Sequence, residues 1–330
     1  MTALNSAHDE ALVETRRPSV GVVVATRDRP ELLARAIGSV LGQRYHGRVE
    51  VLVVFDQCQP DRSLAFDGDG DGADRAVRVL TNDRSPGLAG ARNTGVLASE
   101  GHELLAFCDD DDLWSPGKLD AQVALLAAHP DIEVATTGLF IQAHGRITTR
   151  VLEHERILFT DLLRSRVMEA HPSTYLMRRA AMLGPTGDGS DGIGLVDEDL
   201  PGSYAEDYDW LLRAARRADI GAVRLPLVKV VWHRSSFFAE RWEMIVAALD
   251  HLLATHPEIA TEPIGLARIQ GQQAFALAAL GRRRDARRRA RQALAHNRGE
   301  KRAWLALALC TGLIRSDQVL QVIQMFGRGI

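Results

Sequence analysis

Apolar residues recur along the first part of the chain at spacings that alternate between those of strands and helices. Residues 20–25 are an apolar, largely β-branched run, which predicts a buried strand. After Pro30, apolar residues return every three or four positions as far as Leu41, which predicts an amphipathic helix. Residues 49–55 predict the next strand. The chain therefore begins as strand, helix, strand.

The same alternation continues to about residue 137. Residues 77–80 predict a third short strand, residues 87–98 a glycine-rich segment, and residues 104–108 a buried strand that runs into four aspartates. Ser115 and Pro116 are expected to open a further helix. Residues 132–137 and 228–232 predict later strands. We therefore expect an α/β fold with a mainly parallel sheet, helices on both faces, and ligands at the carboxyl ends of the strands.

Strand patterns end at about residue 240, and helices rich in Ala, Leu and Arg follow, two of them separated by Gly281. One helical face is apolar and lies opposite an arginine-rich surface, in a stretch that resembles one tetratricopeptide hairpin. We expect a flexible lead-in at 1–17, an α/β domain at 18–240 and a helical extension at 241–330. The extension is expected to cap the α/β domain or to form homodimer contacts. Its apolar face comprises Ala286, Ala290, Ala293 and Leu294.

Composition narrows the class of protein. The chain has 330 residues, 46% hydrophobic and 25% charged, with a net formal charge of −3, so it is globular and has no overall attraction to nucleic acid. The three cysteines, Cys58, Cys108 and Cys310, form no CxxC pair, which favours a reducing, cytoplasmic location. No apolar run reaches the ~20 residues of a membrane-spanning helix, which leaves peripheral membrane contact open. No secretory signal is visible at the N-terminus.

Four consecutive aspartates, residues 109–112, follow the buried strand at 104–108. Helix capping would account for one or two of them, but not for four. Carboxylates at positions i and i+2 around a turn can converge on a hard divalent cation, which in turn can bridge the two phosphates of a nucleotide sugar. We therefore interpret this run as a metal-dependent donor site.

A second acidic group, Glu206 and Asp207, stands at the predicted start of an amphipathic helix. Capping alone can explain it, but transfer of a sugar to a hydroxyl also needs a carboxylate that takes the acceptor proton. His233 follows the strand at 228–232 and can complete a cation site. His171 is a weaker candidate for a metal ligand and is expected only to line the wall of the site.

Taken in order, these motifs resemble GT-A glycosyltransferases of family 2, from about residue 18 to about residue 236. Residues 25–29 resemble the family's Thr-x-Asn-Arg turn, with Asp28 in place of the usual Asn, and Asp56 stands where the family usually has two aspartates. Residues 87–95 are similar to its glycine-rich Ala-Arg-Asn stretch. The nucleotide-sugar-binding residues that the resemblance implies are Ala25, Thr26, Arg27, Arg29, Asp56, Arg92, Asn93, Asp109 and Asp110.

The resemblance also implies roles in the reaction. The family's DxD motif corresponds to residues 109–111, which gives Asp109 and Asp111 as ligands of Mg²⁺ or Mn²⁺, joined by His233. The catalytic pair corresponds to Glu206 and Asp207, with Asp207 as the general base of a single in-line, inverting displacement. The partners implied are a nucleotide diphosphate sugar and a hydroxyl acceptor, which is a glycan, a lipid carrier or a metabolite.

Other readings of the sequence remain open. A sugar-nucleotide nucleotidyltransferase or a magnesium-dependent phosphohydrolase would use similar aspartates, and a non-catalytic binding module would work through the seven arginines of residues 282–291.

The absence of GxGxxG and P-loop patterns disfavours dinucleotide enzymes and P-loop NTPases. Residues 67–72 imitate half an EF-hand, but Arg78 stands at the twelfth position, which favours an acidic loop. Residues 184–202 are expected to form a mobile lid.

Overall fold

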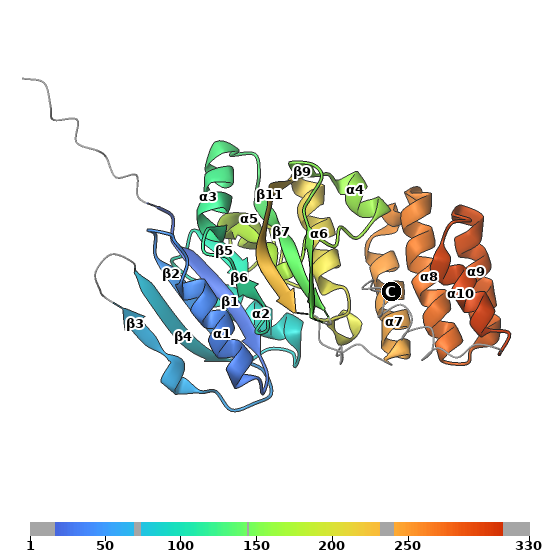
Figure 1. Ribbon diagram of the computed structural model, residues 1–330, viewed down its shortest axis with the longest axis horizontal. Coiled ribbons are helices and arrows are strands. Elements are labelled where there is room, and N and C mark those ends of the chain that lie inside the picture. The colour runs from blue at the N-terminus through green and yellow to red at the C-terminus, as the bar shows by residue number, and fades with distance from the viewer. Residues whose placement is uncertain (1–16, 69–73, 144, 232–240, 313–330) are drawn as a thin grey trace, which may run out of the picture.

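The computed structural model describes residues 17–68, 74–143, 145–231 and 241–312, and places an α/β unit beside a row of helices (Figure 1). The strands are β1 Val20–Thr26, β2 Val49–Phe55, β3 Phe66–Gly68, β4 Arg75–Thr81, β5 Leu104–Phe107, β6 Leu113–Trp114, β7 Val134–Ala143, β8 Arg146–Arg150, β9 Arg156–Ile157, β10 Leu176–Arg178 and β11 Ile220–Val231. The α-helices are α1 Pro30–Leu41, α2 Leu88–Leu97, α3 Lys118–Ala128, α4 Phe159–Arg164, α5 Arg179–Leu183, α6 Glu206–Arg217, α7 Trp242–Thr255, α8 Pro263–Ala279, α9 Arg283–His296 and α10 Lys301–Leu309.

All of these strands belong to one sheet, in the order β3-β4-β2-β1-β5-β10-β7-β11-β6, with β8 on β7 and β9 on β11. The parallel core is β4, β2, β1 and β5, and β7 is parallel to β11. Short antiparallel strands β3, β6 and β10 complete the order. The predicted α/β class with a mainly parallel sheet is confirmed.

Helices cover both faces of the sheet because side chains alternate along each strand. Val22 and Val24 of β1 pack on one face with residues of α1 and α3. Val23 of β1 and Leu52 of β2 point to the other face, where α2 and α6 cover them. The central strands are thus buried on both sides, which explains their uninterrupted apolar runs.

Three predicted boundaries differ from the structure. The third helix begins at Lys118, because Ser115 is still extended and donates its backbone N–H to Leu227 O at 2.9 Å. The strand expected at 132–137 extends over β7 to Ala143. The late strand begins at Ile220, well before residue 228, and its register shifts around Pro226, which interrupts the apolar pattern.

The C-terminal helices share a core with the α/β unit. Apolar residues of α7 and α8, such as Leu249 and Ile269, belong to the same buried cluster as residues of α6. Helices α8, α9 and α10 then pack on one another through alanines, including Ala290 and Ala306. Gly281, with φ of +75°, forms the predicted break between α8 and α9. No helix among the described residues is long and apolar enough to cross a membrane.

A buried polar network also connects this helical part to α6. His256, directly after α7, is fully buried, and its Nε2 lies 2.8 Å from Asp209 Oδ1 on α6. Its Nδ1 lies 3.0 Å from Nη2 of Arg216, which can only donate. Nδ1 therefore accepts, and Nε2–H donates to Asp209, so a neutral imidazole satisfies both partners.

We predict that His256→Leu lowers the free energy of unfolding by about 2–4 kcal/mol, because it removes one partner of a buried, hydrogen-bonded carboxylate. Urea denaturation followed by circular dichroism measures the change. His251→Leu is the matched control on α7: His251 pairs with Asp197 at 2.8 Å but remains 31% exposed, so its loss should cost less than about 1 kcal/mol. Equal losses for the two variants would contradict the role given to His256.

Candidate functional site

The site lies at the carboxyl ends of β1, β2 and β5, where the predicted nucleotide-binding residues meet. Thr26, at the end of β1, donates its hydroxyl to Asp110 Oδ2 at 2.8 Å. Arg29 Nη1 lies 3.1 Å from both Asp110 Oδ1 and Asp111 Oδ2. The turn after β1 and the aspartates after β5 are therefore directly connected, although about 80 residues separate them in sequence.

The turns after two strands pass through left-handed backbone conformations, at Asp28 after β1 and at Gln57 after β2. Asp28 has φ of +53°, a region in which Asn and Asp are the best-tolerated residues other than glycine. This explains why Asp can replace Asn in that turn. Asp56, at the end of β2, is buried and accepts hydrogen bonds from Asn82 Nδ2 at 2.8 Å and from Gly87 N at 3.1 Å. Asp56 thus fixes the entry to α2, where Gly87 adopts φ of +121°.

Helix α2 contributes the two polar residues of the glycine-rich stretch. Arg92 is 3% exposed and places Nη1 2.6 Å from Glu206 Oε1 and Nη2 2.6 Å from Asp109 Oδ1. Burial disfavours the charged guanidinium, but the two carboxylates outweigh burial and raise the pKa of Arg92. Arg92 therefore joins the two acidic groups that the sequence singled out.

Asn93 points away from the aspartates, toward the 184–202 loop. Its Nδ2 donates to Val196 O at 2.8 Å and to Glu198 Oε1 at 2.7 Å, and its Oδ1 accepts from Val196 N at 2.9 Å. All hydrogen-bonding groups of this amide except one lone pair are engaged by the loop. In this structure Asn93 thus anchors the predicted lid.

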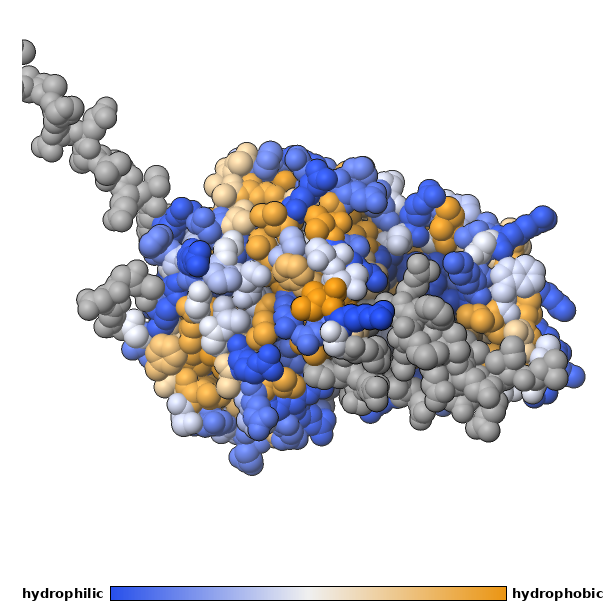
Figure 2. All heavy atoms as spheres, in the orientation of Figure 1, coloured by the Kyte–Doolittle hydropathy of each residue, from blue (hydrophilic) through white to orange (hydrophobic). Residues whose placement is uncertain are grey.

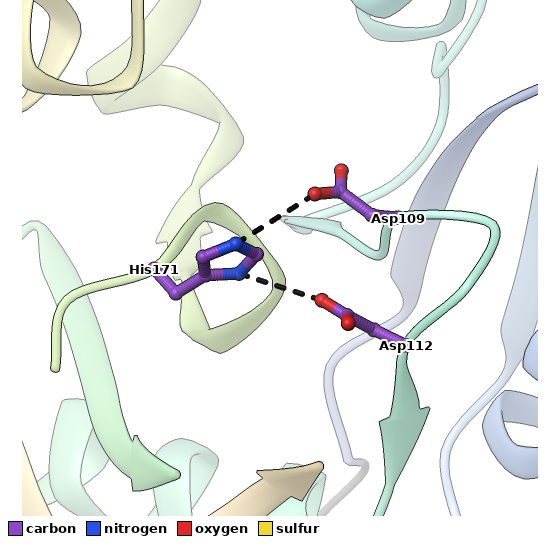
Figure 3. A group of neighbouring side chains, drawn as sticks. All are labelled: Asp109, Asp112 and His171. Atoms are coloured by element: carbon purple, nitrogen blue, oxygen red, sulfur yellow. Dashed lines mark ion pairs between the residues drawn. The ribbon is translucent and has the colours of Figure 1, made fainter. Parts of the chain in front are cut away.

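Three side chains form a cluster that can bind a metal ion (Figure 3). His171 precedes the 3₁₀ turn Pro172–Thr174, and its ring lies between two carboxylates: Nε2 is 3.9 Å from Asp109 Oδ2, and Nδ1 is 3.4 Å from Asp112 Oδ2. One donor atom from each residue lies within 4.8 Å of the others. Opposite ligands of Mg²⁺ are ~4.2 Å apart, so a small contraction would form a site.

The protonation of this cluster fits a cation. His171 Nδ1 accepts a hydrogen bond from Ser173 N at 3.3 Å, so an electron-rich nitrogen faces the Asp112 carboxylate. Burial and the negative charge of Asp109 raise the pKa of Asp112 well above its usual range, and burial lowers the pKa of His171. A cation or a proton between these groups would relieve their repulsion. The donors, carboxylate oxygens and an imidazole, are those that Mg²⁺, Mn²⁺ and Zn²⁺ accept.

The acidic pair at the start of α6 lies on the other side of Arg92. Asp207 is buried and forms an ion pair with Arg166, which lies in the loop after α4. Burial alone would raise the pKa of Asp207, but Arg166 outweighs burial and lowers it. Burial raises the pKa of Glu206 to about 7, against the attraction of Arg92. Asp207 is therefore ionised at neutral pH, whereas burial favours the protonated form of Glu206.

Most of the predicted site residues lie near one another in the structure. Asp109 belongs to the metal-ligand set expected from the sequence and to the cluster in the structure, whereas Asp111 pairs with Arg29. His233 lies outside the described residues. Ala25 is part of β1, and Arg27 is exposed in the turn that follows. Sequence reasoning overlooked Arg166 and Glu198, which lie in polar loops with no periodic signal.

Comparison with known proteins gives a family match over part of the chain. Residues 21–183 match the model of Glycosyl transferase family 2; α6 follows the matched region. The Escherichia coli protein WfgD, named UDP-Glc:alpha-D-GlcNAc-diphosphoundecaprenol beta-1,3-glucosyltransferase, is 27% identical over 149 residues, 44% of this chain and 55% of its own. Protein y4gI of Sinorhizobium fredii, uncharacterized, is 32% identical over 130 residues, 39% of this chain and 14% of its own. The chain thus spans less than two thirds of the length of these relatives.

Solved structures share the fold over nearly the whole chain. S. aureus TarS 1-349 in complex with UDP-GlcNAc has a TM-score of 0.56 at 16% identity, covering 94% of this chain and 92% of TarS 1-349. The mannosyltransferase PcManGT from Pyrobaculum calidifontis, in complex with GDP-Man and Mn²⁺, has a TM-score of 0.51 at 20% identity, covering 94% and 85%. The expected GT-A fold is confirmed. Residues 21–183, about half of the chain, thus match glycosyl transferase family 2.

Proposed function

We propose that this protein transfers a glycosyl group from a nucleotide diphosphate sugar to an acceptor hydroxyl, with inversion of configuration. The observation that carries the proposal is the Arg92 bridge, which holds Asp109 of the donor side and Glu206 of the acceptor side at 2.6 Å each. A phosphohydrolase would need only the first of these acidic groups. Two separate acidic groups joined by one guanidinium suit a reaction between two substrates.

Asp207 is the general base in this proposal. Its carboxylate stays ionised at neutral pH because Arg166 lowers its pKa, so it can accept a proton from the acceptor oxygen as that oxygen attacks the anomeric carbon. The adjacent Glu206 orients Arg92, and thereby Asp109, toward the donor. Burial of all three side chains of Arg92, Glu206 and Asp207 keeps water from competing for these contacts.

The donor side would bind the nucleotide through the strand-end residues Thr26, Arg29 and Asp56 and the aspartates after β5. Asp109 and Asp111 would hold a divalent cation, with Asp112 and His171 as adjacent donors, and His233 as a further ligand expected from the family resemblance. Bound there, Mg²⁺ or Mn²⁺ would neutralise charge on the departing diphosphate. WfgD and TarS suggest UDP sugars as first candidates, and PcManGT suggests GDP-mannose.

The proposed organisation assigns catalysis to residues 18–240, with the 184–202 loop as a lid. The anchoring of this loop by Asn93 on α2, and by the pairing of Asp197 with His251 on α7, supports a closed position over the site. Opening would require these bonds to break.

We predict that Asp207→Asn leaves donor affinity unchanged and lowers the rate of nucleoside diphosphate release by about 10²- to 10⁴-fold, because the amide cannot accept the acceptor proton. Calorimetric titration gives the affinity, and a coupled assay of nucleotide release gives the rate. Asp120→Asn, an exposed aspartate on α3 outside the proposed lid, is the matched control. Turnover near the wild-type rate in Asp207→Asn would refute the assignment of the base.

Replacing Arg166, which pairs with Asp207, should shift the pH dependence of kcat/KM. The pKa of Asp207 is lowered by Arg166, so Arg166→Gln should raise it, and the acid limb of the kcat/KM profile should move upward by about one pH unit. Arg164→Gln, two residues earlier and exposed, should leave the limb in place. Identical profiles for Arg166→Gln and the wild type would mean that Asp207 does not control this limb.

We further predict that Asp111→Ala weakens the Mn²⁺-dependent binding of a nucleotide sugar at least tenfold, because a carboxylate ligand of the cation is lost. The comparison of titrations with and without Mn²⁺ isolates the metal contribution, and Asp61→Ala is an exposed control. His171→Ala should also weaken the Mn²⁺ dependence if the cluster contributes a ligand. Equal Mn²⁺ dependence in wild type and Asp111→Ala would defeat the assignment of Asp111.

A further inference from the structure

Positive charge is concentrated in residues 282–302. This segment carries ten basic and two acidic residues, a formal charge of +8 in a chain whose net charge is −3. The remaining residues therefore sum to −11. Helices α9 and α10 lie at one end of the molecule, and hydrophilic side chains project from that end (Figure 2). Such segregation gives this end a strongly positive potential.

Three arginines of α9 lie on one face of the helix. Arg284, Arg288 and Arg291 occur at positions i, i+4 and i+7, which align along a helix over ~10 Å. All three are exposed. The opposite face is buried against α8 and α10 and contains only small side chains, namely Ala286, Ala290 and Ala293.

Much of this charge is not neutralised within the chain. Asp285 is the acidic residue of α9, and it pairs with Arg282 at 3.2 Å and with Arg288 at 3.0 Å. Arg289 reaches Asp250 on α7 at 3.1 Å. Within the part of the chain that the structure describes, no acidic side chain pairs with Arg284, Arg291, Arg298 or Lys301.

An exposed tryptophan borders these cations. Trp304 on α10 is 56% exposed, and its indole Nε1 donates to Arg298 O at 2.9 Å. The polar atom of the ring is thus satisfied, and its apolar part faces solvent next to Arg298 and one turn after Lys301. Tryptophan rings with basic neighbours are typical of segments that lie at the headgroup level of a bilayer.

We propose that this surface docks the protein onto an anionic phospholipid bilayer. The surface, called here the basic face, comprises Arg284, Arg288, Arg291, Arg298, Lys301 and Trp304. Guanidinium groups pair with lipid phosphates in a bidentate manner, and the ring of Trp304 inserts among the headgroups. These cations are exposed on α9, on α10 and in the turn between them, and exposed cations suit a plane of headgroups better than an enclosed ligand. The proposal concerns binding alone and does not depend on the proposed transferase activity.

The test is co-sedimentation of the full chain with vesicles of phosphatidylcholine, with and without 30% phosphatidylglycerol. We expect binding only to the anionic vesicles, with affinity that falls steeply as salt increases. The triple variant Arg284→Gln, Arg288→Gln, Arg291→Gln should bind about 100-fold more weakly, because each basic residue near the surface contributes roughly a fivefold share. Glutamine keeps helix propensity, and thermal melts confirm folding.

A matched triple variant removes the same charge elsewhere. Arg35→Gln, Arg44→Gln, Arg62→Gln changes exposed arginines of the α/β unit and should retain wild-type vesicle binding. Equal losses of vesicle binding in the two triple variants would overturn the proposal. So would binding of the wild type to neutral vesicles, or its failure to bind anionic vesicles. Displacement from vesicles by millimolar inorganic phosphate, or by duplex DNA at equal phosphate concentration, would also overturn it in favour of another anionic partner.

Trp304 supplies a second readout that needs no loss of charge. Brominated lipids in anionic vesicles should quench part of the wild-type tryptophan fluorescence, and Trp304→Phe should remove that quenching while leaving sedimentation within about threefold of wild type. Quenching that persists in Trp304→Phe would show that another part of the chain meets the bilayer and would refute the assignment of the basic face.

Discussion

The guanidinium of Arg92 lies between Asp109 and Glu206 and stacks over the ring of Phe107, 5.4 Å from its centroid. A buried cation of this kind is stable only when its donors are paired, since an unpaired one would cost several kcal/mol. The pairing fixes α2, the end of β5 and the start of α6 relative to one another. The distance between the carboxylates of Asp109 and Glu206, on which the proposed displacement depends, is therefore set by one side chain.

The helical end of the molecule supports the same arrangement from behind. Asp209, two residues after the proposed base Asp207, is hydrogen-bonded to His256, and the hydroxyl of Tyr208 accepts a hydrogen bond from Arg268 of α8 at 3.1 Å. Consecutive residues of α6 are thus oriented by α7 and α8. The faces of α7 and α8 that contact α6 thus stabilise the site. The exposed arginines Arg284 and Arg291 of α9, in contrast, pair with no acidic side chain among the described residues.

The sequence predicted the parts of the fold that depend on local pattern. Strands β1 and β2 were predicted to within one residue because buried parallel strands are continuous apolar runs. The two- and three-residue strands, such as β9 and β10, were not predicted. Segments this short show no periodicity in sequence, and they pair as strands only in the folded chain. Within the site, residues in motifs were found, but the partnership of His171 with Asp112, and of Arg166 with Asp207, joins positions more than 40 residues apart. No local signal encodes such pairs.

The central claim is that the carboxyl ends of the strands bind a nucleotide diphosphate sugar together with a divalent cation. Thermal denaturation with a panel of UDP, GDP, CDP and dTDP sugars, each with and without Mn²⁺, tests it most directly, because a ligand bound only by the native state raises the melting temperature. We predict a rise of several degrees for the sugars of one nucleotide, and only when Mn²⁺ is present. No rise for any donor, or a rise with Mn²⁺ alone that no nucleotide sugar increases, would contradict the account.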